Sequence, residues 1–102
     1  MLKRTIVETT YGKLQGYNTG LTTLFAGIPY AAPPVGPLRF RPPEPPTPWA
    51  DVRNATYFGH IQPQGTSPLS RFLGPEPQEQ SEDSLFLNVW TPSADNNRRP
   101  VY

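Results

Sequence analysis

The sequence of 102 residues contains no cysteine, so it has no disulfide framework and no thiolate metal site. One histidine and scattered carboxylates do not build a metal coordination sphere either. The opening MLKRTIVETT lacks the apolar core of about 7–15 residues that a signal peptide needs, and no apolar run approaches the roughly 18 residues of a membrane span. These absences predict a cytoplasmic protein without a metal, a cofactor or a membrane partner.

An excess of charge of one sign is also missing. Nine lysine and arginine residues face eight aspartate and glutamate residues, which leaves a net charge of +1. The closest basic grouping is Arg98-Arg99, and a pair of this kind fits a polar turn better than a nucleic-acid contact. We therefore expect no nucleic-acid partner.

Proline, in contrast, is abundant. The chain has 15 prolines, roughly threefold more than the average of about 5% would give, and nine of them lie in residues 29–48. Neither a helix interior nor a central strand accepts such a segment, so residues 31–50 are expected to form an irregular coil pinned by Leu38, Phe40 and Trp49. A proline-rich ligand for an aromatic groove is the alternative interpretation of RPPEPPTP.

Four short segments have the β-branched or alternating composition of strands. Residues 5–9, 14–17 and 22–28 predict an antiparallel meander that begins with a tight turn at Tyr11-Gly12. SLFLNVW, at 84–90, gives the strongest strand signal, and both of its faces are largely apolar. A strand of this kind needs cover on both sides. Because the rest of the sequence supplies no two covering layers, we expect the chain to be an incomplete part of a larger domain.

The sequence shows no catalytic constellation. None of the five serines lies in a G-x-S-x-G elbow, and no H-G-G stretch is present. His60, the only histidine, lies in turn-like sequence, and we interpret it as a surface residue rather than a catalytic base. Glu82 and Asp83 are neighbours on an extended chain, where adjacent side chains point to opposite faces, so they predict a cap or an ion pair and not paired acid catalysis.

Three longer stretches nevertheless carry a family pattern: FAGIPYAAPPVGPLRFRPPEPPTPW at 25–49, NATYFG at 54–59 and SEDSLFLNVWTP at 81–92. Together with the opening TIVETTYGKLQGY, they resemble the N-terminal region of type B carboxylesterases. This group includes bacterial p-nitrobenzyl esterases and the cholinesterases. The resemblance covers nearly the whole chain and is weakest at residues 60–80.

The resemblance implies an α/β-hydrolase fold, of which residues 1–102 would be the N-terminal, incomplete part of one catalytic domain. This part would be mostly β, with an antiparallel meander, the first strands of the main sheet and a long proline-rich coil. The implied activity is that of a bacterial serine esterase that acts on small-molecule esters through an acyl-enzyme. The catalytic residues would all lie in the remainder of the polypeptide, so the isolated chain would be inactive. The alternative is a catalytically inactive, cholinesterase-like binding or adhesion protein.

The resemblance also assigns roles to single residues. Arg39 matches an arginine that pairs with the glutamate of the S-E-D motif, here Glu82, and a buried fork between the two would tie the coil to the last strand. Ser84 stands where many relatives have cysteine, and the partner cysteine, expected near Gln62, is absent as well. The loop between them would then be held by the Arg39–Glu82 pair and by packing alone.

The same loop borders the mouth of the active-site gorge in the family. Leu69, Phe72 and Leu73 are therefore candidate contacts for the acyl or alcohol part of a substrate, and simple packing of the loop is the open alternative. No residue clearly replaces the cholinesterase aromatic that holds quaternary ammonium, so choline esters are not expected. Residues 54–56, Asn-Ala-Thr, fit a glycosylation sequon, which matters only in a secreted protein.

Overall fold

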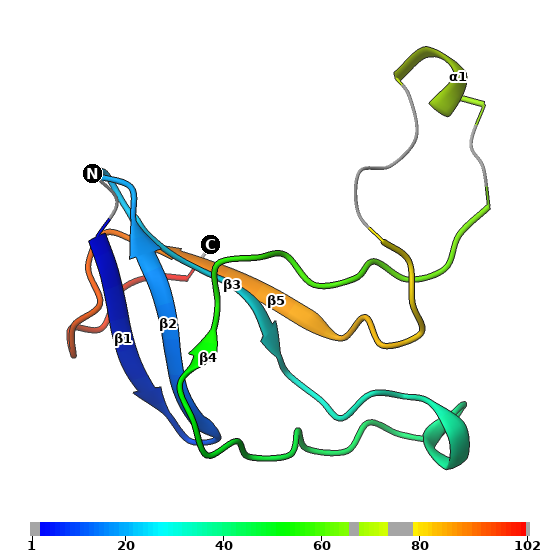
Figure 1. Cartoon of the computed structure of the whole chain (residues 1–102), viewed down its shortest axis with the longest axis horizontal. Coiled ribbons are helices and arrows are strands. Elements are labelled where there is room, and N and C mark those ends of the chain that lie inside the picture. The colour runs from blue at the N-terminus through cyan, green and yellow to red at the C-terminus, as the bar shows by residue number, and fades with distance from the viewer. Residues whose placement is uncertain (1–2, 66–67, 74–78, 102) are drawn as a thin grey trace.

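The computed structural model of the chain describes residues 3–65, 68–73 and 79–101. Within these ranges one sheet holds five strands: β1 (Lys3–Thr9), β2 (Gly12–Asn18), β3 (Thr23–Pro29), β4 (Arg53–Asn54) and β5 (Phe86–Thr91). Two single-turn helices lie outside the sheet, the 3-10 helix η1 (Gly36–Leu38) and α1 (Ser70–Leu73). Figure 1 shows the sheet at one end of the molecule and the long loop that carries α1 at the other.

β1 and β2 form an antiparallel hairpin that pairs from Lys3 opposite Asn18 to Thr9 opposite Gly12. The turn is formed by residues 10–11, one position earlier than predicted. The Thr9 hydroxyl donates to the Gly12 carbonyl at 2.7 Å and accepts the N–H of Tyr11 at 3.3 Å, so a local side chain completes the turn. The hairpin itself is confirmed.

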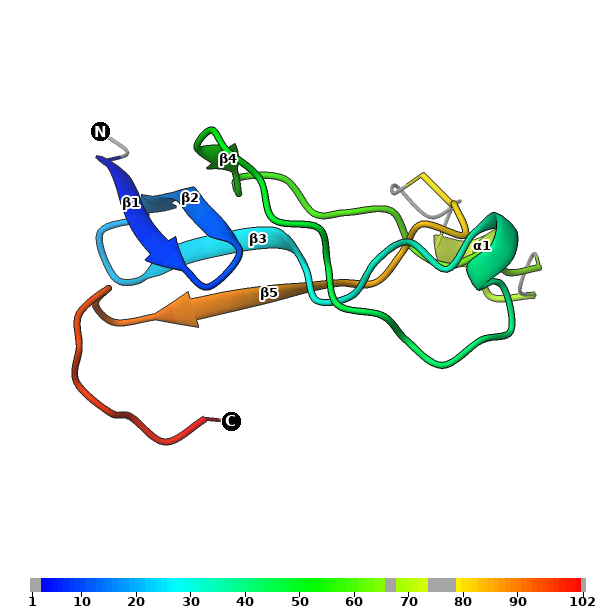
Figure 2. The same cartoon turned by 90° about the horizontal axis from the view of Figure 1, so that it is seen from below.

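The predicted meander is also confirmed. β3 pairs antiparallel with β2, and β5 pairs antiparallel with β3, which gives the order β1-β2-β3-β5. β5 corresponds to the strand predicted at 84–90. Figure 2 shows that the segment after β5, residues 92–101, turns back beneath the sheet. Leu87, Val89 and Trp90 of β5 are all exposed, although Phe58 lies beside Trp90 and Gly59 beside Phe86. The described part of the chain thus covers this strand only in part.

One edge of β2 is shared by two partners. β3 pairs with β2 only at residues 17–18 and then diverges, and β4 occupies the vacated edge in parallel orientation, with Leu14 opposite Arg53. We call residues 53–55 the wedge. Its last residue, Ala55, donates its N–H to the Gln15 carbonyl at 2.8 Å and accepts the N–H of Ala26 at 2.8 Å. Ala55 and Ala26 are fully buried where the backbones of β2, β3 and the wedge meet. Only small side chains fit at this point.

The hydrophobic core gathers around this junction. Its buried members are Leu14, Phe25 and Ala55, against which Val7, Ile28 and Trp49 pack while remaining partly exposed. The core is therefore small and one-sided for a chain of this length.

β3 contains a bulge where its register against β5 shifts between Phe25 and Ile28. Gly27 lies in the bulge with φ of +66°, and a Cβ at this position would collide with the Tyr57 carbonyl oxygen. Its N–H donates to the Asn88 side-chain oxygen at 3.0 Å. Asn88, a polar residue in the middle of β5, thus accepts the Gly27 N–H that the bulge leaves without a partner in the β-ladder.

Residues 31–50 form the expected coil, but only part of its predicted anchoring is correct. Trp49 holds the coil to the hairpin, because its indole donates to the Lys13 carbonyl at 2.8 Å and covers Gly12, where no Cβ would fit. Leu38 is half-buried. Phe40 is 94% exposed, and its ring faces only the Arg39 guanidinium at 5.2 Å, so its predicted anchoring role is wrong.

Candidate functional site

The Arg39–Glu82 ion pair is present in the structure. Arg39 follows η1, and its Nε donates to Glu82 Oε1 at 2.6 Å. The two side chains are 56% and 45% exposed, and one nitrogen is engaged rather than two, so the buried fork expected from the sequence is wrong. The reason is local: both residues lie in surface segments outside the sheet, and Arg39 also stacks on an exposed ring. The pair still joins the coil to the segment that enters β5.

The three apolar residues proposed as substrate contacts lie on and beside α1. Leu69, Phe72 and Leu73 are 61%, 87% and 77% exposed. Figure 1 shows the reason, since α1 lies at the tip of the loop, away from the sheet. The loop therefore presents an apolar surface to its surroundings, and contact with a substrate stays a prediction. The alternative that these residues pack the loop down also stays a prediction.

The base of this loop is closed by backbone hydrogen bonds. We call residues 60–64 and 79–82 together the neck. Ile61 and Gln80 form an isolated parallel bridge in it. The N–H of Ile61 donates to the Glu79 carbonyl at 3.0 Å, and the N–H of Ser81 donates to the Ile61 carbonyl at 2.9 Å.

A side chain adds to this closure, because Gln80 Oε1 accepts the N–H of Gln64 at 3.2 Å. The expectation that the Arg39–Glu82 pair and packing alone hold the loop is therefore wrong. Cysteine is absent, with serine at 84 and glutamine at 62, and hydrogen bonds close the loop instead. An isolated bridge between two residues carries no periodic signal, so the sequence could not reveal it.

His60 lies in the neck and is exposed, as its interpretation as a surface residue requires. Its Nε2 lies 3.5 Å from Glu79 Oε2. His60 and Ser84 both line a surface hollow of about 440 Å³. Among the described residues, however, no hydrogen bond joins the imidazole to a serine hydroxyl, so the two do not form a nucleophile–base pair.

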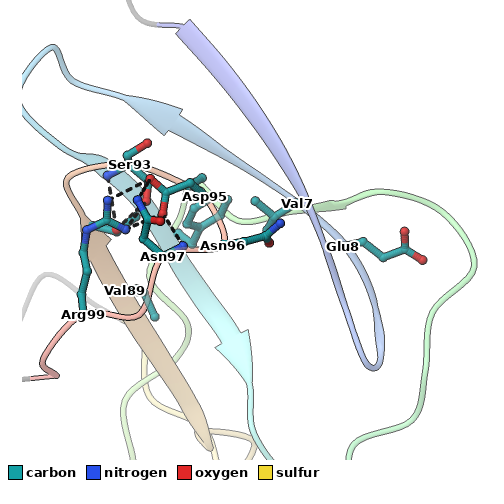
Figure 3. A pocket seen from close by; sticks show the side chains of 11 residues that line it. Val7, Glu8, Val89, Ser93, Asp95, Asn96, Asn97 and Arg99 are labelled. Carbon is teal, nitrogen blue, oxygen red and sulfur yellow. Dashed lines mark hydrogen bonds and ion pairs between the residues drawn. The ribbon is translucent and has the colours of Figure 1, made fainter.

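A second hollow, of about 530 Å³, lies between the sheet and the chain that follows β5 (Figure 3). Its apolar floor comes from three strands and consists of Val7, Phe25 and Val89. Its rim is polar and includes Asp95 and Arg99. The hollow thus lies between the apolar face of the sheet and the turn that carries Asp95 and Arg99.

The charged turn is held by an ion pair with two hydrogen bonds, between Arg99 and Asp95. Arg99 donates from Nη1 and Nη2 to the two carboxylate oxygens of Asp95 at 2.6 and 2.8 Å. The hydrogen bonds from Arg99, and then that from the N–H of Asn97, hold the pKa of the Asp95 carboxyl well below its usual range. A carboxylate so firmly ionised is no proton donor near neutral pH. The i,i+4 spacing of the two residues predicts a contact only on a helix, and residues 95–99 are not helical, so the sequence contains no signal for this pair.

No three histidine or acidic side chains in the described ranges approach closely enough to hold a metal ion. Among the described residues, no helix has the length and apolar character to cross a membrane. The described residues thus provide contacts that hold the loop, an apolar loop tip and two surface hollows. They do not bring together a group of side chains that could carry out a reaction.

Comparison with known proteins identifies close relatives. The model of the carboxylesterase family matches residues 3–102. The para-nitrobenzyl esterase of Bacillus subtilis (strain 168) is 46% identical over 96 residues, which are 94% of this chain and 19% of that protein. Human neuroligin-3 is 38% identical over 113 aligned positions, covering 90% of this chain and 13% of that protein.

The fold has a close counterpart among solved structures. A carboxylesterase from Geobacillus stearothermophilus, crystallised at pH 6.2, superposes with a TM-score of 0.80 and 46% identity. The match covers 95% of this chain and 18% of that one. The chain therefore spans less than a fifth of the length of each of these three proteins.

Proposed function

Because the chain belongs to the carboxylesterase family, we propose that the whole protein is a type B carboxylesterase that hydrolyses small-molecule carboxylic esters with a serine nucleophile. In this reaction the serine attacks the ester carbonyl, the alcohol leaves, and water releases the acyl group from the enzyme. The observation that carries the proposal is the identity of 46% to a protein named para-nitrobenzyl esterase. The bacterial source of that relative also supports a bacterial enzyme.

In this proposal, residues 1–102 form the N-terminal part of a single catalytic domain. The antiparallel sheet is that of an α/β-hydrolase, as its structural relatives indicate. The reacting groups would come from the remainder of the same polypeptide, since the described residues hold no serine–histidine pair. The exposed faces of β5 support this arrangement, because apolar strand faces are stable when another layer covers them.

The apolar loop tip would serve as the rim of the substrate site. Phe72 and Leu73 are exposed on the short helix α1 and Leu69 just before it, which suits contact with an apolar acyl or alcohol group. The Arg39–Glu82 pair would hold the second arm of this loop to the proline-rich coil. Both roles are proposals that rest on the esterase assignment.

We also propose a cytoplasmic location. The complete lack of cysteine supports it, because proteins exported to oxidising compartments commonly carry disulfides. Fractionation of the source cells, with the protein followed by antibody, tests this. Recovery in the exported fraction would overturn it.

The esterase proposal is tested on the whole protein with p-nitrophenyl esters of increasing acyl length and with a fluorophosphonate that labels reactive serines. We expect steady release of p-nitrophenol and stoichiometric labelling that abolishes it. A sample pretreated with the fluorophosphonate is the matched control for spontaneous hydrolysis. A folded protein that neither hydrolyses these esters nor takes the label would overturn the proposal.

The second candidate is a binding or adhesion protein with the same fold and no catalytic serine. One observation favours it, namely the 38% identity to neuroligin-3, a relative whose name is not that of an enzyme. The same experiment separates the two functions. A cooperative thermal transition together with absent labelling would favour the binding protein, whereas labelling would exclude it.

A further inference from the structure

We propose that β1 is a dimerisation edge, along which two copies of the protein pair through antiparallel β1 strands centred on Ile6. The partner is thus a second copy of this chain. The proposal goes beyond the proposed function and does not rest on ester hydrolysis, so it applies equally to a binding protein.

One edge of β1 is open. Among the described residues, β1 pairs only with β2, and it is the terminal strand in the order β1-β2-β3-β5 (Figure 1). No backbone hydrogen bond joins β1 to any other described segment. The edge that faces away from β2 therefore presents unpaired N–H and C=O groups, which form a template for another strand.

The side chains of β1 present a charged and apolar pattern on this open strand. Arg4, Ile6 and Glu8 alternate along one face and are exposed, whereas Val7 on the other face packs against the core. Figure 3 shows the Glu8 carboxylate extending away from Val7 and from the charged turn after β5. Among the described residues, neither Arg4 nor Glu8 takes part in an ion pair. The exposed face thus carries a positive, an apolar and a negative side chain, in that order.

This order makes the strand complementary to itself. In an antiparallel pair centred on Ile6, Arg4 of one copy lies opposite Glu8 of the other, and the two Ile6 side chains face each other. A two-fold axis passes through the centre of such a pair, so the same ion pair forms twice. Opposite charges and apolar groups that face each other across two strands both stabilise the pairing.

The backbone groups agree with the same register. Along a strand the N–H and C=O groups point alternately to the two edges, so every second residue of β1 faces the open edge. Pairing centred on Ile6 places even-numbered residues opposite even-numbered ones, and odd-numbered residues opposite odd-numbered ones. The outward-facing groups of one copy therefore meet the outward-facing groups of the other.

Other antiparallel registers lose this complementarity. A shift by two residues places Ile6 opposite Arg4 or Glu8 and leaves a charge without its partner. A shift by four residues places Arg4 opposite Arg4, or Glu8 opposite Glu8, and like charges directly opposite each other destabilise a strand pair. The sequence of β1 therefore selects the register centred on Ile6.

Sedimentation velocity of the whole protein tests the dimer. One pair of short strands buries less than the roughly 1,200 Å² of a stable interface, so we expect a weak, reversible dimer. It should be populated at about 100 µM and dissociated at about 1 µM. A monomer over this whole range would overturn the proposal and would favour cover of the edge by the remainder of the polypeptide.

Charge reversal assigns the dimer to β1. Glu8→Arg places an arginine opposite Arg4, and Arg4→Glu places a glutamate opposite Glu8, so we expect each variant to dimerise about tenfold more weakly. A mixture of the two variants forms both ion pairs again and should dimerise like the wild type. Glu44→Arg makes the same charge change at an exposed position of the coil and should leave the dimer intact. A dimer that persists in both β1 variants, or that mixing does not restore, would overturn the proposal.

A crosslink tests the register, since the sequence contains no cysteine of its own. Only residue 6 lies opposite its own copy, so Ile6→Cys should form a disulfide-linked dimer under mild oxidation. Lys3→Cys is the matched control, because Lys3 would lie opposite Thr9 of the other copy and should not crosslink. Non-reducing electrophoresis of the whole protein, with the wild type as background, measures both. Equal crosslinking of the two variants would overturn the proposed register, whatever the esterase assays show.

Discussion

The sheet and the loop between residues 60 and 85 are held by different kinds of interaction. In the hairpin, seven residue pairs form a continuous backbone ladder, and the wedge adds further hydrogen bonds around a buried alanine. In the described part of the loop, the ties are one isolated bridge, a hydrogen bond accepted by the Gln80 side chain and the exposed Arg39–Glu82 ion pair. Cooperative backbone pairing over a packed core resists local opening, whereas scattered surface ties do not. The molecule thus combines a firmly paired sheet with a loop that has few backbone hydrogen bonds in its described part.

Substitutions in the sheet should therefore have the largest effects, and Ala55→Leu the largest of these. The added side chain has no space at the junction of β2, β3 and the wedge, so we expect about 3 kcal/mol of destabilisation. Urea denaturation of the whole protein measures it. Ala50→Leu, at an exposed position of the coil, is the control and should change stability little. Equal effects of the two substitutions would contradict the role of the wedge.

The bulge predicts an intermediate effect. Asn88→Ala removes the acceptor for the buried N–H of Gly27, and we expect a loss of about 1 kcal/mol. Hydrogen exchange should place the change at residues 26–28. Asn96→Ala, on the exposed turn after β5, lacks such a partner role and serves as the control. A larger loss in the control would show that the bulge does not need the side chain.

The Arg39–Glu82 pair predicts a smaller effect on global stability, because both side chains are exposed. Glu82→Gln should cost about 0.5 kcal/mol in the free energy of unfolding while increasing proteolysis of the loop between residues 60 and 85. Limited proteolysis compared with Glu8→Gln measures this. If cleavage of the loop is unchanged, the pair does not tether it.

We expect the smallest effect on stability from a substitution in the charged turn at residues 93–99, and only at acid pH. Because Arg99 lowers the pKa of Asp95, the pair stabilises the turn above the ordinary pKa of an aspartate and loses this contribution as the pH falls toward the lowered pKa. Asp95→Asn should therefore remove part of the acid sensitivity of exchange at residues 93–99. An unchanged acid response in the variant would show that the pair does not stabilise the turn.

The contrast between sheet and loop also explains what the sequence could predict. The hairpin, the meander and β5 follow from β-branched residues and alternation, because each strand is long enough to show a period. β4 has only two residues, and the bridge at Ile61 joins single residues, so neither leaves a pattern. The Arg39–Glu82 contact came from the family resemblance, whereas its exposure depends on neighbours that no local pattern specifies.

Phe40 shows that a residue with a clear sequence signal can also be predicted wrongly. An aromatic residue in a proline-rich coil is usually expected to be buried, yet Phe40 follows η1 with φ of +59° and extends into solvent. Hydrophobicity predicts how much a side chain gains from burial, but the backbone decides whether a surface lies within reach.

The shared edge of β2 has a consequence for the order of folding. The hairpin closes through a two-residue turn, whereas the wedge reaches Leu14 and Gln15 only after the long coil has been brought back, at a far larger cost in chain entropy. We expect the hairpin to be formed in the rate-limiting transition state and the wedge to dock after it. Stopped-flow kinetics would then show Val7→Ala slowing refolding and Ala55→Gly mainly accelerating unfolding. The edge that β3 leaves open is thus the last place in the sheet to be filled.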